Sequence, residues 1–365
     1  MTPPRLQAPL ALFTLALSLH WANASGATAA MVPVVLSITT NTAEITGFSR
    51  IGVHRNLPPN HDEGMFAKEN YAIENAAPGM ARDTAVFVAS LPPGDYNFSY
   101  FMSVQGKYLS AKDKAILGNF TVAAGKAVDL GRLVLTPVND KVIIGRVSGS
   151  ASNRDMLRSA LPAQAALFTG AVAPGWNEPI LKDQSLERLA RAATVGADCP
   201  TERADGTVFA ASRLGTILIR SPAGNWRGVH GPGLESLLRV LPVDLPDTEA
   251  IAVGELGTLV RKPRGEDVLV PIDPGNLPLG SLSGIQGSPA AGWFVKHQQG
   301  DNVTLFRSPT LDAGTWTPIV KTDARLNERH RRSSMFLWQT PTGMGYAGAQ
   351  GPISRSTRQP ANGAI

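Results

Sequence analysis

The sequence predicts an all-β fold, and three features of its 365 residues lead to that prediction. Between residues 31 and 137, short runs of β-branched and aromatic residues are separated by turns rich in glycine and proline. In the C-terminal half, one strand–turn–strand motif returns four times, about every 45 residues. Only residues 183–193 carry the pattern of an amphipathic helix. We therefore expect an N-terminal β-sandwich followed by a small or partial β-propeller of about four repeats.

Residues 1–29 have the layout of a secretory signal peptide. Arg5 precedes an apolar run at 8–19, and small-residue cleavage patterns follow at 22–24 and 27–29. A run of twelve residues is too short to span a membrane, which takes about twenty. No cysteine follows the run, so the sequence offers no lipid-anchor site there. We expect a periplasmic or secreted protein without a transmembrane segment, with a buried N-terminal helix as the alternative interpretation.

The charge and the cysteine content restrict the class of function. The chain has 34 Lys and Arg against 29 Asp and Glu, and a net charge of +5 is too mild to indicate nucleic-acid binding. Cys199 is the one cysteine, so no disulfide forms within the chain. We expect it to be a small buried hydrophobe, while a reactive thiol or a link between two copies stays open. The polar segment at 60–64 has no partner ligands at metal spacing, so we expect neither a metal nor a cofactor.

The sandwich is predicted over residues 30–137, and its clearest part is a hairpin. Two runs rich in β-formers, 84–90 and 96–101, flank a turn that holds two prolines and a glycine. Tyr96, Phe98 and Tyr100 alternate with small polar residues, so these three rings are expected to pack inward.

A second hairpin is predicted over 118–122 and 127–135, with Gly131 marking a β-bulge. The string Leu91-Pro-Pro-Gly-Asp-Tyr96, followed by Asp129-Leu-Gly-Arg-Leu133, resembles the transthyretin-like or carboxypeptidase-regulatory-like β-sandwich modules. The resemblance covers about a hundred residues. It implies a module that stiffens or binds and that does not itself catalyse.

Residues 138–200 are predicted to be a linker with short strands and one helix. Residues 141–145 are typical of a strand that ends the sandwich or begins the linker. The helix over 183–193 is placed to cap the first repeat, because terminal repeats must cover an apolar face. The propeller repeats are then expected over 201–365, as either a complete or an incomplete set.

Each copy of the repeat is an apolar run, a turn with glycine, and a second strand that ends in arginine. The copies occupy 208–220, 250–261, 292–307 and 345–355, ending in Arg220, Arg261, Arg307 and Arg355. Because these arginines occupy the same place in each copy, we interpret them as a structural repeat position and not as a cluster for an anionic substrate. A period near 45 residues is that of one four-stranded blade.

Two copies continue into a turn that ends in tryptophan. The segment from Ser308 to Trp316 contains Asp312, Gly314 and Thr315, and it resembles the Asp-box turn of BNR repeats, which photosystem-assembly propellers share. It has one residue fewer between glycine and threonine than that pattern, and the earlier turn, which ends at Trp226, lacks the aspartate. The resemblance covers about 150 residues and implies the repeat class of fold.

Motifs of catalysis are missing from the sequence. The segment 280–284 has leucine where a nucleophile elbow needs serine, and neither a His-Glu-x-x-His helix nor a phosphate-binding loop occurs. Four carboxylates of the repeat region form no facing pair that the spacing would reveal; they are Glu249, Glu255, Glu266 and Asp267. We expect a protein that is not an enzyme.

A basic stretch at 325–332 and two tryptophans are the predicted partner-binding residues. The residues are Arg325, Arg329, Arg331, Arg332, Trp226 and Trp316. Arginine and tryptophan dominate the energetics of many interfaces. The alternative interpretation is a solvated loop between blades, with both tryptophans in the core.

Together these features predict an exported binding or assembly protein of the bacterial cell envelope that presents a propeller surface to a protein partner. Two alternatives stay open. One is a secreted glycan-active hydrolase of the sialidase type. The other is a structural protein that self-associates, because an open propeller leaves strand edges free to pair with another copy.

Overall fold

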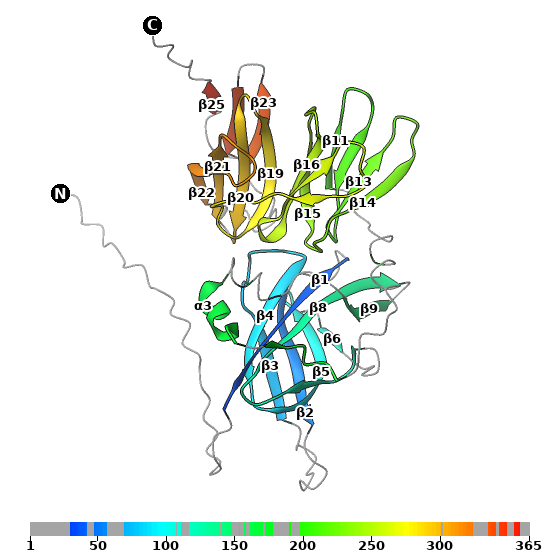
Figure 1. Ribbon diagram of the computed structural model, residues 1–365, viewed down its shortest axis with the longest axis vertical. Helices are drawn as coiled ribbons and strands as arrows, with labels where there is room; N and C mark the ends of the chain where they lie inside the picture. Colours follow the sequence, from blue (N-terminus) through cyan, green and yellow to red (C-terminus); the bar gives the residue numbers. More distant parts are fainter. Residues whose placement is uncertain are drawn as a thin grey trace, which may run out of the picture.

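Five β-sheets account for nearly all of the secondary structure described in this computed structural model (Figure 1). The structure describes residues 30–41, 47–56, 69–106, 108–110, 117–138, 141–147, 153, 157, 161–170, 172–177, 190, 198–300, 302–323, 335–340, 343–348 and 354–357. The described helical elements are short: α3 (Pro162–Ala165) and the 3-10 turns η1 (Ala166–Phe168) and η2 (Glu255–Gly257). The prediction of an all-β fold is confirmed.

One curled sheet of ten strands forms the lower body in Figure 1. Its strands are β1 (Val32–Thr40), β2 (Phe48–Asn56), β3 (Glu69–Asn75), β4 (Thr84–Leu91), β5 (Gly94–Ser103), β6 (Tyr108–Ser110), β7 (Phe120–Val122), β8 (Ala127–Val138), β9 (Lys141–Arg146) and β10 (Val172–Ala173). They run in the order β10-β8-β1-β4-β3-β2-β5-β6, with β7 beside β5 and β9 beside β8. Alternate side chains of β1, β2, β4, β5 and β8 fill one core between the opposed parts of this sheet. We call this body the sandwich.

The first predicted hairpin is wrong in its pairing, although both of its strands exist. β4 pairs with β1 and β3, whereas β5 pairs with β2, β6 and β7. Pro92 and Pro93 offer no N–H to a ladder, so the chain leaves the sheet after Leu91 and crosses to re-enter beside β2. The Tyr96 hydroxyl donates to the Pro92 carbonyl at 2.7 Å and ties this crossing.

The second predicted hairpin is also a crossing. β7 pairs with β5, whereas β8 pairs in parallel with β1. The bulge predicted at Gly131 is confirmed: β8 gains one residue on β1 between Asp129 and Arg132, and Gly131 has a φ of 68°. Only glycine adopts such an angle freely.

The sandwich extends further along the chain than the predicted boundary at residue 137. β9 pairs with the end of β8 and β10 pairs in parallel with its beginning, both on the edge of β8 opposite β1. Trp176 lies against the sandwich core, and its indole N–H donates to the Leu130 carbonyl at 2.8 Å. The predicted helix over 183–193 falls almost wholly outside the described residues.

Four smaller sheets form the upper body, and we number them as blades 1 to 4. Blade 1 is β11 (Asp198–Glu202), β12 (Val208–Ala211), β13 (Thr216–Arg220) and β14 (Trp226–His230); blade 2 is β15 (Leu237–Pro242), β16 (Thr248–Gly254), β17 (Leu259–Pro263) and β18 (Val270–Pro271); blade 3 is β19 (Ser281–Ser288), β20 (Gly292–Gln299), β21 (Asn302–Ser308) and β22 (Thr317–Asp323); the described strands of blade 4 are β23 (Met335–Thr340), β24 (Gly343–Gly348) and β25 (Ser354–Thr357). Each predicted copy of the repeat is the hairpin of the second and third strands of one blade.

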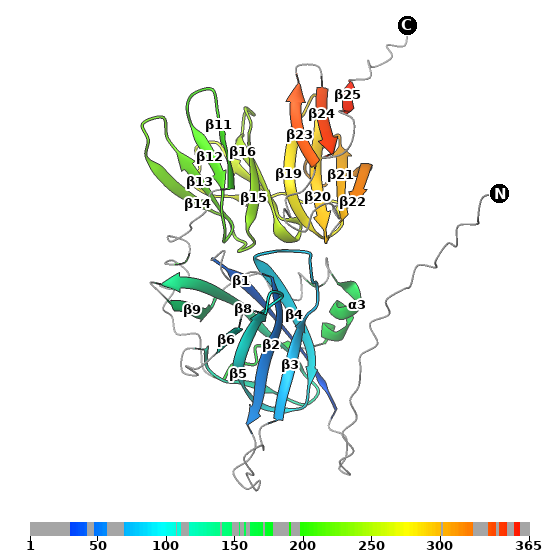
Figure 2. The ribbon, with the colours of Figure 1, turned by 180° about the vertical axis from the view of Figure 1, so that it is seen from behind.

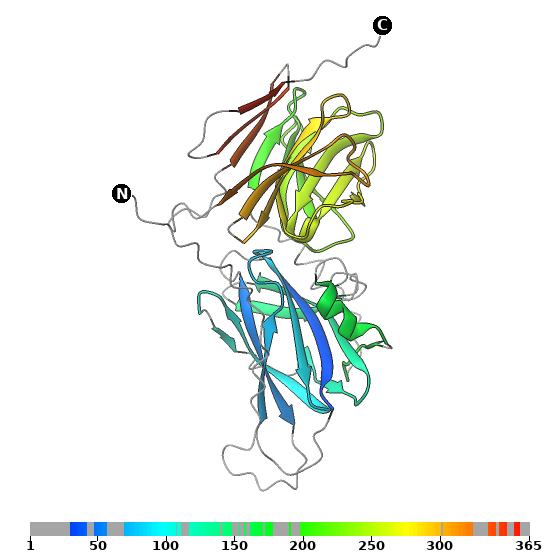
Figure 3. The same ribbon diagram turned by 90° about the vertical axis from the view of Figure 1, so that its left-hand side faces the viewer.

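The blades stack as in a propeller. Their first strands lie beside one another, β11 on β15, β15 on β19 and β19 on β23. One apolar cluster fills the space between blades 1 and 2, and another fills the space between blades 2 and 3. Figure 2 shows blade 4 from behind, and Figure 3 shows the two bodies stacked end to end.

The repeated arginines do not converge on one site. Arg220, Arg261 and Arg307 are exposed, each on the third strand of its own blade. Arg261 pairs with Asp247 at 3.5 Å, and the guanidinium of Arg307 lies over the ring of Phe294 at 5.6 Å. The interpretation of a structural repeat position fits these separate local contacts.

The hydrogen bond from the Tyr96 hydroxyl to the Pro92 carbonyl can be tested with Tyr96→Phe. Losing the bond to the Pro92 carbonyl leaves a polar group unpaired in a part-buried place and should lower the stability of the sandwich by about 1 kcal/mol. Denaturant unfolding measures this change. The matched control is Tyr108→Phe at an exposed ring, which should change stability by less than about 0.5 kcal/mol. Equal effects of the two variants would contradict a structural role for the Tyr96 hydroxyl.

Candidate functional sites: the domain junction and the tyrosine pocket

The turn between β3 and β4 joins the two bodies. We call residues 79–83 the junction turn; it lies at the end of the sandwich that faces the blades (Figure 1). The Gly79 carbonyl accepts a hydrogen bond from the Gly300 N–H at 3.0 Å, and the Met80 carbonyl accepts one from the Ser281 hydroxyl at 2.8 Å. Ser281 is on β19 of blade 3, and Gly300 is in the turn between β20 and β21 of the same blade.

Two buried carboxyl groups make the next contacts of this turn. One oxygen of Glu255 accepts the backbone N–H groups of Arg82 at 2.6 Å and of Asp83 at 2.7 Å. The carboxylate of Asp83 in turn accepts from Nε of Arg213 and from the hydroxyl of Ser236, both at 2.9 Å. Glu255 and Asp83 are both buried. The junction turn is therefore bound by blade 1, by blade 2 and by blade 3.

Arg213 and Glu255 occupy the same position of the repeat, in the turn between the second and third strands. Each is followed by a leucine in the left-handed region, Leu214 with a φ of 53° and Leu256 with a φ of 52°. A leucine there is unfavourable by about 1–2 kcal/mol. Both leucines pack against the sandwich. Leu214 belongs to an apolar cluster that includes β8 of the sandwich, and Leu256 packs against a second cluster that includes β1 and β4. The repeated Leu-Gly-Thr turn thus docks the blades on the sandwich.

A buried ion pair adds a second connection. Arg132 of β8 and Glu235, which lies between blades 1 and 2, are 2.7 Å apart, and the Arg132 side chain is almost fully buried. Burial acts to raise the pKa of Glu235, but the Arg132 guanidinium and backbone hydrogen bonds outweigh it and lower that pKa. Glu235 therefore stays ionised, and its charge is balanced within the junction.

Glu255 has the opposite protonation behaviour. Burial, followed by the negative charge of Asp83, raises the pKa of Glu255 to about 8. The carboxyl group is thus mostly protonated at neutral pH. A neutral carboxyl group accepts the two amides of the junction turn without placing a second negative charge beside Asp83.

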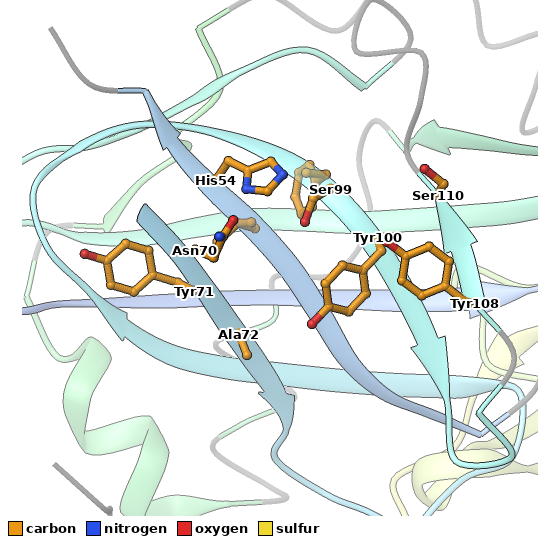
Figure 4. A pocket seen from close by; sticks show the side chains of 10 residues that line it. His54, Asn70, Tyr71, Ala72, Ser99, Tyr100, Tyr108 and Ser110 are labelled. Carbon is orange, nitrogen blue, oxygen red and sulfur yellow. The ribbon is translucent and has the colours of Figure 1, made fainter. Parts of the chain in front are cut away.

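A pocket of about 580 Å³ lies on the sandwich, on the face of β2, β3, β5 and β6 that points away from the core (Figure 4). Tyr100 and Tyr108 form one side of it, stacked with ring centroids 5.0 Å apart and planes at 27°. His54, Asn70 and Ser99 contribute polar groups. The paired rings and polar side chains make this pocket suited to a small ligand.

Tyr100 does not pack inward, which corrects the sequence-based expectation. Its strand gains one residue relative to β2, because Gly52 pairs with Tyr100 while Val53 pairs with Phe98. This bulge at Ser99 turns Tyr100 to the outer face and places Phe101 in the core in its stead. Tyr96 and Phe98 are buried as expected. No glycine marks the bulge, so the sequence carries no signal for it.

The predicted partner-binding tryptophans differ in their surroundings. Trp226 is 54% exposed on β14, the edge strand of blade 1. Trp316 is 2% exposed, packs in the cluster between blades 2 and 3, and exchanges backbone hydrogen bonds with the side chain of Asn276. Trp316 is thus a core residue, as the alternative interpretation has it. The predicted basic residues, Arg325, Arg329, Arg331 and Arg332, lie outside the described residues.

The carboxylates considered for glycan hydrolysis are held apart by their own contacts. Glu249 pairs with Lys262 at 2.7 Å, Asp267 pairs with Arg227, and Glu255 binds the junction turn. In the Asp-box-like turn, Asp312 accepts the N–H of Asp273 at 3.0 Å. These carboxylates bind neighbouring side chains or main chain, and the pocket described above has no carboxylate in its lining.

Among the described residues, no helix is long and apolar enough to cross a membrane. Within the same residues, His, Cys, Asp and Glu side chains do not gather in groups of three that could hold a metal ion. The polar segment at 60–64 lies outside this part of the chain.

Comparison with known proteins provides little. No family model matches the chain, and no curated protein matches it in sequence. Among solved structures, it is similar to a protein from Bacteroides uniformis ATCC 8492 that is provisionally named a 6-phosphogluconolactonase. The TM-score is 0.32 with 13% sequence identity, over 87% of this chain and 94% of that chain. A likeness of this size carries no argument about activity.

The expectation that the protein is not an enzyme is corrected at this point. One solved structure to which the chain is similar is named as an enzyme, so that expectation is withdrawn, and the likeness assigns no activity to this chain.

The junction predicts a pH dependence that Glu255→Gln should remove. The pKa of Glu255 is about 8 when folded against an ordinary value of 4.5, so its contribution to stability is complete below about pH 4.5 and is lost as the pH rises towards 8. The glutamine carbonyl still accepts the two amides but does not titrate. The melting temperature of the variant relative to wild type should therefore rise across this interval.

Two controls make this comparison specific. Burial lowers the pKa of His297, which acts with the opposite sign, so variant and wild type are compared at each pH. Glu266→Gln, at an exposed residue, should leave the pH profile as in wild type. A Glu255→Gln profile parallel to wild type would show that Glu255 does not titrate in this interval.

Proposed function

We propose that this protein is an exported binding protein that holds a protein partner on the outer face of blade 1. The signal-peptide pattern of residues 1–29 supports export. The observation that carries the proposal is Trp226, a large aromatic side chain that is 54% exposed on a terminal blade.

The strand alternation supports this assignment of the face. Ile219 and Val229 pack into the cluster shared with blade 2, so the neighbouring positions on β13 and β14 point the other way. Those positions include Arg220 and Trp226, which are paired across the two strands and are both exposed. Tryptophan with a flanking arginine is the composition found at interface hot spots.

The edge of the same blade supports a partner there as well. β14 ends the order β11-β12-β13-β14, so the outer side of the strand has no neighbour in that sheet. An exposed edge strand offers backbone N–H and C=O groups to a segment of another chain. A partner that covers Trp226 can also pair with this edge.

Trp226→Ala tests the proposal. If Trp226 anchors the partner, the variant should bind it at least about 30-fold more weakly, the loss expected for a hot-spot residue. The partner is identified by photo-crosslinking in an envelope extract from position 220, which is paired with Trp226 across the two strands, and its affinity is then measured with purified proteins. The melting temperature should not change, because the side chain is mostly in solvent.

The matched control is Ile319→Ala, an exposed apolar residue on blade 3. It should bind the partner as wild type does. Equal affinities of the Trp226 variant and wild type would reject this face. Crosslinking only to a second copy of the chain would favour the self-associating protein instead.

The predicted basic stretch gives a separate test. Changing Arg329, Arg331 and Arg332 together to alanine should weaken capture at low salt and leave the melting temperature unchanged, if the stretch acts by long-range attraction between charges, which salt screens. Capture that is the same with and without these arginines would remove the stretch from the proposal.

A further inference from the structure

The pocket on the sandwich is lined by side chains from four strands and lies apart from the blades. We propose that it binds an uncharged saccharide, with a sugar ring stacked on the Tyr100–Tyr108 pair. The site is on the other body of the protein from Trp226 and does not depend on the proposed partner surface.

Gly52 makes room for the ring of Tyr100 at the base of the pocket. A Cβ atom at Gly52 would lie 2.1 Å from the ring of Tyr100, so the missing side chain lets that ring lie across the strand. Tyr108 on β6 stacks on Tyr100 and is 60% exposed. A stacked pair with an open face presents a flat apolar surface to solvent, which is the surface that the C–H face of a pyranose covers.

Polar side chains on the same four strands lie beside the two tyrosine rings. His54 and Asn70 come from β2 and β3, whereas Ser99 and Ser110 come from β5 and β6. These side chains both donate and accept hydrogen bonds, as sugar hydroxyls require.

The charge of the pocket selects an uncharged ligand. None of its ten lining residues is Asp, Glu, Lys or Arg. A phosphate or carboxylate group would find no lysine or arginine among these side chains. A neutral saccharide matches both the rings and the polar rim.

The experiment is a titration of the mature full chain with neutral trisaccharides of glucose, galactose, mannose and N-acetylglucosamine, followed by calorimetry and ligand-observed NMR. At least one should bind with a Kd of about 10 mM or tighter. Tyr108→Ala should weaken that binding roughly tenfold, while Tyr108→Phe should keep it, because the ring and not the hydroxyl stacks.

A second variant tests the contact between Gly52 and the Tyr100 ring without removing an aromatic side chain. Gly52→Ala should displace the Tyr100 ring and weaken binding, with the melting temperature used to confirm that the chain still folds. Trp226→Ala is the matched control and should bind the saccharide as wild type does. This control also keeps the test separate from that of the partner surface.

Three outcomes would overturn the proposal. They are the absence of binding by every trisaccharide at about 10 mM, binding that Tyr108→Ala and Gly52→Ala leave unchanged, and tyrosine-dependent binding of adenosine in the absence of saccharide binding. Adenosine is the appropriate competitor because a nucleobase also stacks on tyrosine rings.

Discussion

The arrangement of the two bodies depends on one carboxyl group that bonds to the main chain of the other body. Glu255 binds two successive amides of the junction turn through a single oxygen, in a place without water access. Shortening this side chain would leave the buried Asp83 N–H unpaired, at a penalty of about 1–3 kcal/mol, together with the part-buried N–H of Arg82. Because the Leu256 backbone beside it is held in the left-handed region, the position of Glu255 is set by the turn and not by a flexible side chain alone. Arg213 and Glu255, a cation and a neutral carboxyl group at the same repeat position, both bind the junction turn.

The elements were more predictable from the sequence than their partners. Runs of β-formers between turn residues locate the ends of β4, β5 and β8 to within three residues, and the repeat period locates the central hairpin of each blade. The pairing of β4 and β5 was not predictable in this way, because strands joined by Pro92 and Pro93 pair with partners far along the chain. A bulge with glycine, at Gly131, leaves a trace in the sequence, whereas the bulge at Ser99 leaves none. That difference is why the outward position of Tyr100, and with it the pocket, was missed.

The two tryptophans show how repeat position decides burial. Trp226 and Trp316 follow the same Ser-Pro turn, but Trp316 is covered by blade 2 while Trp226 lies on the far side of blade 1. A terminal repeat has a neighbour on one face only. Periodicity alone therefore cannot separate a core tryptophan from a surface one. The docking contacts made by Arg213 and Glu255 were equally hidden, because their partner at residues 79–83 lies in the other body.

The place of β1 in the sandwich has a consequence for how the chain folds. β1 is the first described strand, yet it lies inside the sheet, between β4 and β8. Its parallel partner β8 comes late, with Ser37 and Arg132 separated by 95 residues. Until β8 has been translated and delivered, the apolar stretch Val32–Thr40 has a free edge. Folding of the sandwich is therefore slow, because it depends on contacts between residues far apart in the sequence. A partly synthesised chain exposes an apolar, aggregation-prone strand that a chaperone would have to shield.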